Sequence, residues 1–313
     1  MINNNKNRMA SALLKSTLVV VLDFVLNILW SILSLVIISA VIYATTGSYP
    51  GSDVLFGGLE SSPEYLLVTS SYNIFAIAMV FMFWKYVDHQ NTEVIGLKRR
   101  TNSLRLFGTG LLLGSLEIVM VVLLSLSAGT LWFDKSGFEV FSTTEIFRSL
   151  IYGSMAFILV GFGEEAVFRG YIQRRLMLSV GNKSALAAST LLFMAAHILT
   201  YGKLLDFIDV ALGGLIMGYL YLLTDSLYLP AAYHFIFDYL QVNIMRLQDY
   251  EYYKGAVLFI FNNTGDLTLS GVNYGNIVEL SFITAELVML LLLYILGRRI
   301  RDIGNPTAGV SDI

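Results

Sequence analysis

Residues 147–178 read FRSLIYGSMAFILVGFGEEAVFRGYIQRRLML, an apolar stretch that is long enough to cross a membrane as one helix. A bilayer core about 30 Å thick needs roughly 20 helical residues. The stretch nevertheless contains Glu164, Glu165 and Arg169 well inside its length. Because a charge in the middle of a membrane costs a few kcal/mol or more, these residues indicate a functional site as well as a membrane fold.

The whole chain has the composition of a membrane protein. Hydrophobic residues make up 56% of its 313 residues, charged residues make up 14%, and the mean hydropathy is +0.69. A soluble domain has about 25% charged residues. The net charge of -3 is too small to indicate nucleic acid, so we expect no nucleic-acid partner. The absence of cysteine excludes disulfides, thiolate metal ligands and cysteine nucleophiles.

Eight stretches are apolar and long enough to be predicted as transmembrane helices. Their approximate ranges are 17–43, 65–85, 106–131, 147–178, 184–201, 206–224, 227–243 and 277–297. They are continuous apolar runs, unlike the alternating segments of about ten residues that are typical of outer-membrane barrels. We therefore predict an all-α polytopic membrane protein with about eight transmembrane helices. Residues 1–313 contain no linker or repeat and are interpreted as a single membrane domain.

Basic residues indicate how the chain crosses the membrane. If the first predicted helix begins in the cytoplasm, the cytoplasmic segments carry most of the Lys and Arg residues, as the positive-inside rule requires. These residues are Lys6, Arg8, Lys15, Lys98, Arg99, Arg100, Arg105, Arg174, Arg175, Lys183, Arg298, Arg299 and Arg301. Both termini are then expected to be cytoplasmic.

The longest stretch between predicted helices is residues 244–276. Its aromatic residues and its Asn and Gly turn signals are typical of a loop at the membrane interface. Such a loop could cover or gate a site.

Three ionisable residues in different predicted helices lie at similar depth. Glu164 lies roughly 15 Å from the cytoplasmic end of its helix, His197 roughly 21 Å and His234 roughly 14 Å, at about 1.5 Å per residue. Two of the three histidines in the chain are therefore placed inside apolar helices at one level. The third, His89, lies in the loop VDHQNTEV and is interpreted as a solvated residue.

Glu165 and Arg169 are four residues apart, so they are predicted to form an ion pair on one helix face. Glu164 lies about 100° further round the helix and has no such partner. It can therefore face a cavity and act as a base or hold a ligand. The structural alternative for Glu165 and Arg169 is a buried ion pair that only fixes helix packing.

Two further pairs have the same spacing of four residues, Phe193 with His197 and His234 with Asp238. An imidazole and a carboxylate on one face form either half of a metal site or a pair that handles protons. A buried histidine bonded to a neighbouring carbonyl is the structural alternative.

Other features of the predicted helices concern packing. Gly214 and Gly218 are four residues apart, which allows another helix to approach closely. Asp23 and Glu117 also lie inside predicted helices. Each could face the bundle, bond a neighbouring side chain or lie near an interface, and neither has a predicted role.

Three motifs together resemble the CAAX-protease and bacteriocin-processing (CPBP) family of intramembrane proteases, which includes the CAAX prenyl endopeptidases. The resemblance covers about residues 161–240, interpreted as the motif-bearing protease core. The matching residues are Glu164, Glu165 and Arg169 for EExxxR, Phe193 and His197 for FxxxH, and His234 and Asp238 for HxxxN or HxxxD.

The resemblance implies an eight-helix membrane protease whose buried cavity hydrolyses a peptide bond of a membrane-bound or lipid-modified substrate. For bacterial members it implies a link to bacteriocin maturation or self-immunity. Glu164 would be the general base that activates a water, with His197 assisting. His234 and Asp238 would bind a metal or stabilise the oxyanion.

The same resemblance implies supporting roles for Glu165, Arg169 and Phe193. It also implies a bacterial plasma membrane as the location of the protein.

Asp238 stands where many family members carry Asn. An ionised Asp cannot donate a hydrogen bond to an oxyanion, so this residue favours a metal. His197, His234 and Asp238 would supply three ligands to a divalent metal such as zinc and leave a position for water. The alternative is a water activated without metal by Glu164 and His197.

Two other functions remain open at this level. A non-catalytic immunity or scaffold protein could retain the same fold and bind a peptide. A proton-coupled transporter could use Glu164 and the histidines as a relay, but it predicts inverted repeats, which are not evident in the sequence.

Overall fold

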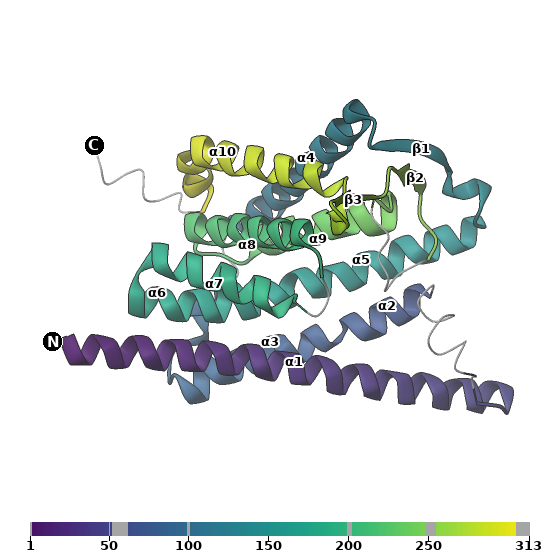
Figure 1. The fold of residues 1–313 in the computed structure, drawn as a ribbon. Coiled ribbons are helices and arrows are strands. Elements are labelled where there is room, and N and C mark those ends of the chain that lie inside the picture. The colour runs from purple at the N-terminus through teal and green to yellow at the C-terminus, as the bar shows by residue number, and fades with distance from the viewer. Residues whose placement is uncertain are drawn as a thin grey trace.

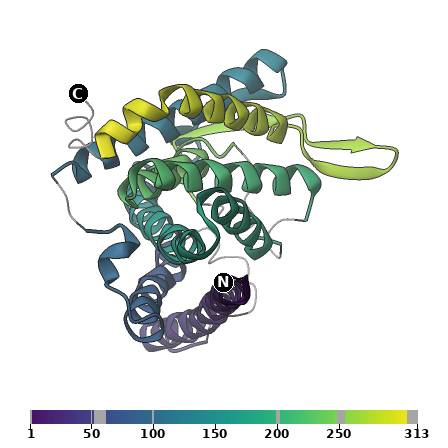
Figure 2. The same ribbon diagram turned by 90° about the vertical axis from the view of Figure 1, so that its left-hand side faces the viewer.

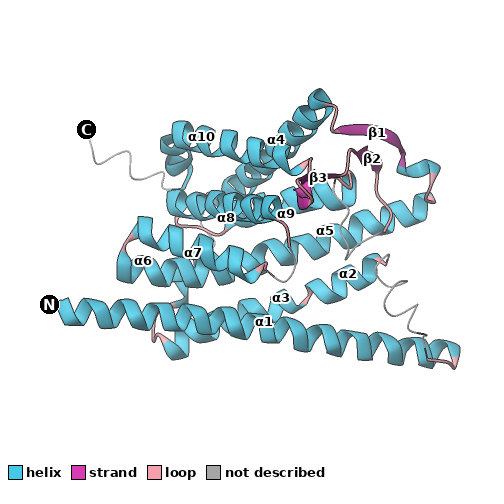
Figure 3. Cartoon of the chain, viewed as in Figure 1, coloured by secondary structure: helices cyan, strands magenta, loops and turns pink. Residues whose placement is uncertain are grey.

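The computed structural model describes residues 2–49, 51, 62–98, 101–198, 202–247 and 255–304, which are mostly helical (Figure 3). The α-helices are α1 (Ile2–Thr46), α2 (Pro63–Ser70), α3 (Tyr72–Met82), α4 (Ser103–Ala128), α5 (Thr143–Glu165), α6 (Arg174–Val180), α7 (Asn182–Ala196), α8 (Leu204–Thr224), α9 (Tyr228–Tyr239) and α10 (Glu279–Gly304). Other helical segments are η3 (Phe83–Val87), η4 (Thr92–Ile95), η5 (Gly137–Glu139), η6 (Ala166–Gln173) and η7 (Leu240–Ile244). The strands are β1 (Leu131–Ser136), β2 (Phe259–Asn263), β3 (Asp266–Leu269) and β4 (Val272–Asn276).

Six helical stretches of the described chain are long and apolar enough to cross a membrane. The predicted all-α polytopic membrane protein is therefore confirmed. The stretches are Met9–Thr46, Pro63–Val87, Ser103–Ala128, Thr143–Val180, Leu204–Thr224 and Glu279–Gly304.

One of the eight predicted helices is shorter in the structure: the segment expected at 184–201 is α7, with 15 residues. The segment expected at 227–243 is α9 continued by η7, a helix without a break from Tyr228 to Ile244. α9 is surrounded by other helices, and its residues from Leu229 to Phe235 are all buried. A helix enclosed in this way does not need the length of one that faces lipid.

The helices form a bundle with α9 at its centre, where it packs against α4, α5 and α8. Figure 1 shows α1 along one side of the bundle and α4 with α10 along the other, and Figure 2 shows the same order from one end. The start of α1 and the end of α10 lie at one end of the molecule, and β1 and β2 lie at the opposite end (Figure 1).

Strands form in the connections, which the sequence analysis did not predict. β1 pairs with β2 in antiparallel register, Leu131 opposite Asn263, and β3 pairs with β4. Ser270 and Gly271 both have positive φ, 51° and 80°, as the tight turn between β3 and β4 requires. The loop expected at 244–276 is therefore partly a hairpin, and its residues 248–254 lie outside the described part of the chain.

The motif-bearing helix runs without a break from α5 through η6 to α6. Ser142 begins it with a reciprocal capping box, in which Ser142 and Glu145 each accept a backbone N–H of the other. The segment η6 is wound more widely than the predicted α-helix. Two of its carbonyls accept side-chain hydrogen bonds, Gly170 from the Trp84 indole at 3.0 Å and Phe168 from the Ser189 hydroxyl at 3.0 Å. These external bonds offset the loss of regular α-helical pairing.

The glycines predicted to bring helices together do so. Arg169 Nη2 donates to the Gly214 carbonyl at 2.8 Å, and Gln173 Nε2 donates to the Gly218 carbonyl at 2.9 Å. Both bonds need η6 to lie close to the α8 backbone, which the missing side chains of the glycines permit.

Gly161 brings α5 equally close to α9. A Cβ added there would lie 2.6 Å from the Ala231 carbonyl oxygen and 3.0 Å from the Phe235 nitrogen. The two glutamates that follow in α5 are therefore held beside the histidine of α9.

Gly161→Val should lower the free energy of unfolding by about 1–3 kcal/mol, because the new side chain meets the α9 backbone. Unfolding of the purified protein in mixed micelles of increasing dodecyl sulfate content measures this loss. Gly108→Val is the matched control, since a Cβ added at Gly108 meets nothing within 4 Å. Equal losses for the two variants would contradict the close approach.

Candidate active site

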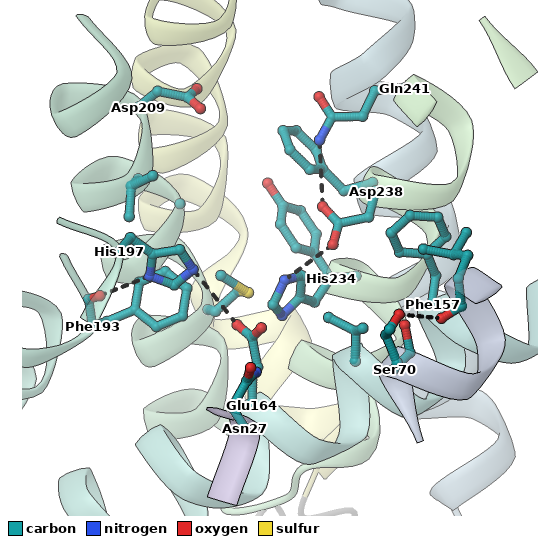
Figure 4. A pocket seen from close by; sticks show the side chains of 18 of the residues that line it. Asn27, Ser70, Phe157, Glu164, Phe193, His197, Asp209, His234, Asp238 and Gln241 are labelled. Atoms are coloured by element: carbon teal, nitrogen blue, oxygen red, sulfur yellow. Dashed lines mark hydrogen bonds and ion pairs between the residues drawn. The ribbon is translucent and has the colours of Figure 1, made fainter. Parts of the chain in front are cut away.

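A cavity of about 510 Å³ lies among the helices, within the range of about 300–1,000 Å³ that is typical of ligand sites. Residues of α1, α2, α3, α5, α8, α9, α10 and the end of α7 line it. Figure 4 shows Glu164 reaching between His197 and His234, with Asp238 beyond His234. The structure thus brings all four predicted catalytic residues, together with Phe193, to one cavity.

Glu164 and His197 face each other across one part of this cavity. Glu164 Oε2 lies 3.9 Å from His197 Nε2, which is too long for a direct hydrogen bond. Glu164 Oε2 is buried and has no hydrogen-bond partner among the described residues. A water molecule beside the two atoms would satisfy this oxygen and contact the imidazole.

His197 follows the last residue of α7, whereas the sequence placed it well inside a helix. Its φ and ψ of -93° and 1° end the α-helical geometry, and its Nδ1 lies 2.8 Å from the Phe193 carbonyl oxygen. Because a carbonyl only accepts hydrogen bonds, Nδ1 carries the proton in this contact. In the neutral imidazole Nε2 is then the acceptor on the side of Glu164.

Glu165 is fully buried and contacts two cationic or polar partners. Its Oε1 lies 2.9 Å from Arg169 Nη1 and 3.1 Å from His234 Nδ1. The predicted ion pair with Arg169 is therefore present. The Arg169 guanidinium also lies 4.6 Å above the ring of Phe193. Glu165 thus connects the motif helix to α9, and Arg169 connects it to α7 and α8.

His234 lies between two carboxylates. Its Nε2 is 3.4 Å from Asp238 Oδ2, so the predicted pair on one face of α9 is present. Gln241 Nε2 donates to Asp238 Oδ1 at 3.3 Å. The imidazole can donate to Glu165 and Asp238 together only when both of its nitrogens carry protons.

The predicted metal ligands are not arranged as a metal site. In the described ranges, no three His, Asp or Glu side chains are placed to hold a metal ion together. Each nitrogen of His234 faces a carboxylate, and one nitrogen of His197 faces a carbonyl. His197, His234 and Asp238 therefore do not fit a common metal in this geometry, and the zinc site predicted from the sequence is left to a direct test.

Two carboxylates of the cavity were missed in the sequence analysis, Asp209 on α8 and Glu286 on α10. Both lie inside predicted transmembrane helices, where a single carboxylate is itself the signal. Glu117, which had no predicted role, is fully buried and interacts electrostatically with Asp209. Asp23 interacts electrostatically with Glu164. His89 is exposed, as predicted.

Part of the chain is similar to a known protein family. Residues 146–240 match the model of the Rce1-like type II CAAX prenyl endopeptidases. The match confirms the resemblance drawn from the three motifs, and it supports a membrane endopeptidase at the level of the family.

The chain is also similar to a particular curated protein, the Uncharacterized protein YpbD of Bacillus subtilis (strain 168). The two are 30% identical over 129 residues, which is 39% of this chain and 62% of the relative. The chain therefore matches less than two thirds of the relative's length. No solved structure matches the chain.

Arg169→Met should lower the free energy of unfolding by about 3–5 kcal/mol, because it leaves the Glu165 carboxylate buried without its cation. The control is Arg148→Met, which removes a largely exposed ion pair with Glu64 and should cost at most about 1 kcal/mol. Both losses are measured by unfolding in dodecyl sulfate. Equal effects would mean that the buried pair does not hold the helices together.

Proposed function

We propose that the protein is an intramembrane endopeptidase that hydrolyses a peptide bond of a membrane-associated substrate with a water activated by Glu164. The observation that carries the proposal is the placement of Glu164 Oε2 and His197 Nε2, 3.9 Å apart, at the wall of the cavity. A water bound beside both atoms can direct one hydrogen to each, so that an oxygen lone pair faces the substrate.

In the proposed reaction, Glu164 accepts a proton from this water while the water oxygen bonds to the carbonyl carbon of the scissile peptide. The electron pair of the C=O bond moves to its oxygen and forms the oxyanion. When the C–N bond breaks, Glu164 passes the proton to the leaving nitrogen. The products are a carboxyl group and an amine, and Glu164 returns to its ionised form.

His234 is the proposed donor to the oxyanion. Its Nε2–H makes only a long contact with Asp238, at 3.4 Å, and can be shared with a substrate oxygen. Glu165 supports the charge of the imidazole from the other nitrogen, at 3.1 Å. A preformed donor of this kind stabilises the charge that develops in the transition state.

The proposed substrate is a peptide or protein that is itself held in the membrane by an apolar segment or a lipid. The cavity lies among helices that cross the membrane, so a tethered substrate reaches it from the bilayer. The family description, a CAAX prenyl endopeptidase, supports this class. A bacterial plasma membrane, and a role in bacteriocin maturation or self-immunity, are finer proposals that rest on the sequence motifs.

Glu164→Gln should reduce cleavage of palmitoylated reporter peptides by at least about 100-fold, because the amide cannot accept the proton of the water. Cleavage is measured by mass spectrometry with purified protein in lipid nanodiscs. Glu93→Gln changes an exposed carboxylate of η4 and serves as the control with expected unchanged activity. Folded wild-type protein that cleaves no tethered peptide would favour a non-catalytic immunity or scaffold protein.

Elemental analysis of the purified protein tests whether it binds zinc. We expect less than about 0.1 zinc per chain and cleavage that resists chelators, because the potential ligands face carboxylates and a carbonyl rather than a common point. Stoichiometric zinc that is lost in His234→Ala would contradict this expectation and restore the metal set predicted from the sequence.

A further inference from the structure

One end of the cavity contains acidic residues that the proposed hydrolysis does not use. Asp209 of α8 and Glu286 of α10 line it, together with Tyr233, Phe237 and Asp238 of α9. We call these five residues the acidic end of the cavity. Figure 4 shows Asp209 on the opposite wall from Asp238.

The Asp, Glu, Lys and Arg residues that line the cavity are all acidic. Among the described residues that line it, four are carboxylates, Glu164, Asp209, Asp238 and Glu286, and none is Lys or Arg. Asp209 also interacts electrostatically with Asp206, Asp238 and Glu286. Carboxylates gathered in one buried site repel one another unless a cation lies between them.

Several carboxylate oxygens at the acidic end of the cavity accept no hydrogen bond from the described residues. The Glu286 side chain is 1% exposed, and neither its Oε2 nor Asp209 Oδ1 has a hydrogen-bond partner among the described residues. Glu117, which is fully buried and interacts electrostatically with Asp209, has no hydrogen-bond partner among the described residues at either oxygen. Buried polar atoms in native proteins are normally paired, so these oxygens indicate that a donor group is missing.

The Tyr233 hydroxyl is an independent observation of the same kind. Tyr233 is 2% exposed, lines the cavity and has no hydrogen-bond partner in the described structure. Its ring is stacked on that of Phe237, with centroids 6.2 Å apart and planes at 11°. Aromatic faces beside carboxylates form a wall that suits a cation with an apolar stem.

We propose that the acidic end of the cavity is a subsite for a positively charged side chain, Arg or Lys, of the substrate. The proposal rests on the proposed function and deepens it by naming the substrate class. Lys supplies three donors and Arg five, enough for the unpartnered oxygens of Asp209, Glu286 and Tyr233. Since the described residues place no three ligands for a metal ion, an organic cation is the occupant that the geometry favours.

The position of the subsite also indicates where the charge lies in the substrate. Asp238 belongs to the acidic end and contacts His234, the proposed oxyanion donor, at 3.4 Å. A side chain bound there belongs to a residue close to the scissile bond. We therefore infer cleavage beside a basic residue of a membrane-tethered peptide.

The test compares palmitoylated decapeptides that differ only by Arg or its neutral isostere citrulline, moved through each position. Binding is measured with full-length Glu164→Gln protein in nanodiscs, so that the peptides stay intact. At one position the Arg peptide should bind at least about tenfold more tightly, as expected for charge-assisted hydrogen bonds in a buried site.

Two isosteric variants in the same background, Asp209→Asn and Glu286→Gln, should each reduce this preference to less than about threefold. Asp134→Asn is the control, because it removes a charge in β1 from a residue that does not line the cavity. It should retain the preference. Melting temperatures establish that each variant is folded. The ratio of Arg-peptide to citrulline-peptide affinity in the Glu164→Gln protein alone tests the proposal even if a further variant fails to fold.

Equal binding of Arg and citrulline peptides at every position, or a preference that survives in both variants, would overturn the subsite. Cleavage by the wild-type protein is measured in parallel. Glu164-dependent cleavage without an Arg preference would sink only the subsite, whereas Arg preference without cleavage would sink only the endopeptidase.

Discussion

The buried Glu165 carboxylate is the contact on which the rest of the site depends. It lies at once against Arg169 of its own helix and His234 of α9, at 2.9 and 3.1 Å. Arg169 in turn reaches the Gly214 carbonyl of α8. Since a charge away from water must be paired, these contacts fix three helices relative to one another. Their register leaves Glu164, the neighbouring residue, directed at the cavity.

The two adjacent glutamates therefore have different surroundings, because successive residues of a helix point about 100° apart. Glu165 faces protein and is fully buried, whereas the Glu164 side chain is 18% exposed and faces the cavity. The wide turn of η6 follows directly and carries Arg169 back toward Glu165. The same helix thus supplies one glutamate that holds the helices together, Glu165, and one that is the proposed base, Glu164.

Local spacing predicted the pairs Glu165 with Arg169 and His234 with Asp238, because residues four apart on a helix meet regardless of the surrounding fold. Spacing could not predict that Glu165 bonds His234, since that contact depends on how α5 meets α9. Spacing also could not predict η6, whose Gly170 carbonyl accepts a hydrogen bond from the distant Trp84. Nor could it predict β1 and β2, which pair although they lie in different connections of the chain. Asp209 and Glu286 were missed because each is a lone carboxylate, although a charge in an apolar helix was the available signal.

The length of α9 has a consequence for how the protein enters its membrane. Together with η7 it forms one helix from Tyr228 to Ile244 that extends at most about 25 Å, short of a hydrocarbon core of about 30 Å. Alone in lipid, this segment would leave its ends and the paired charges of His234 and Asp238 in hydrocarbon. We therefore expect α9 to insert together with α8, to which Asp225, Ser226 and Leu227 join it, as a helical hairpin already partly shielded by protein. The site would then form as α8 and α9 assemble with the other helices, and not by independent insertion of each helix.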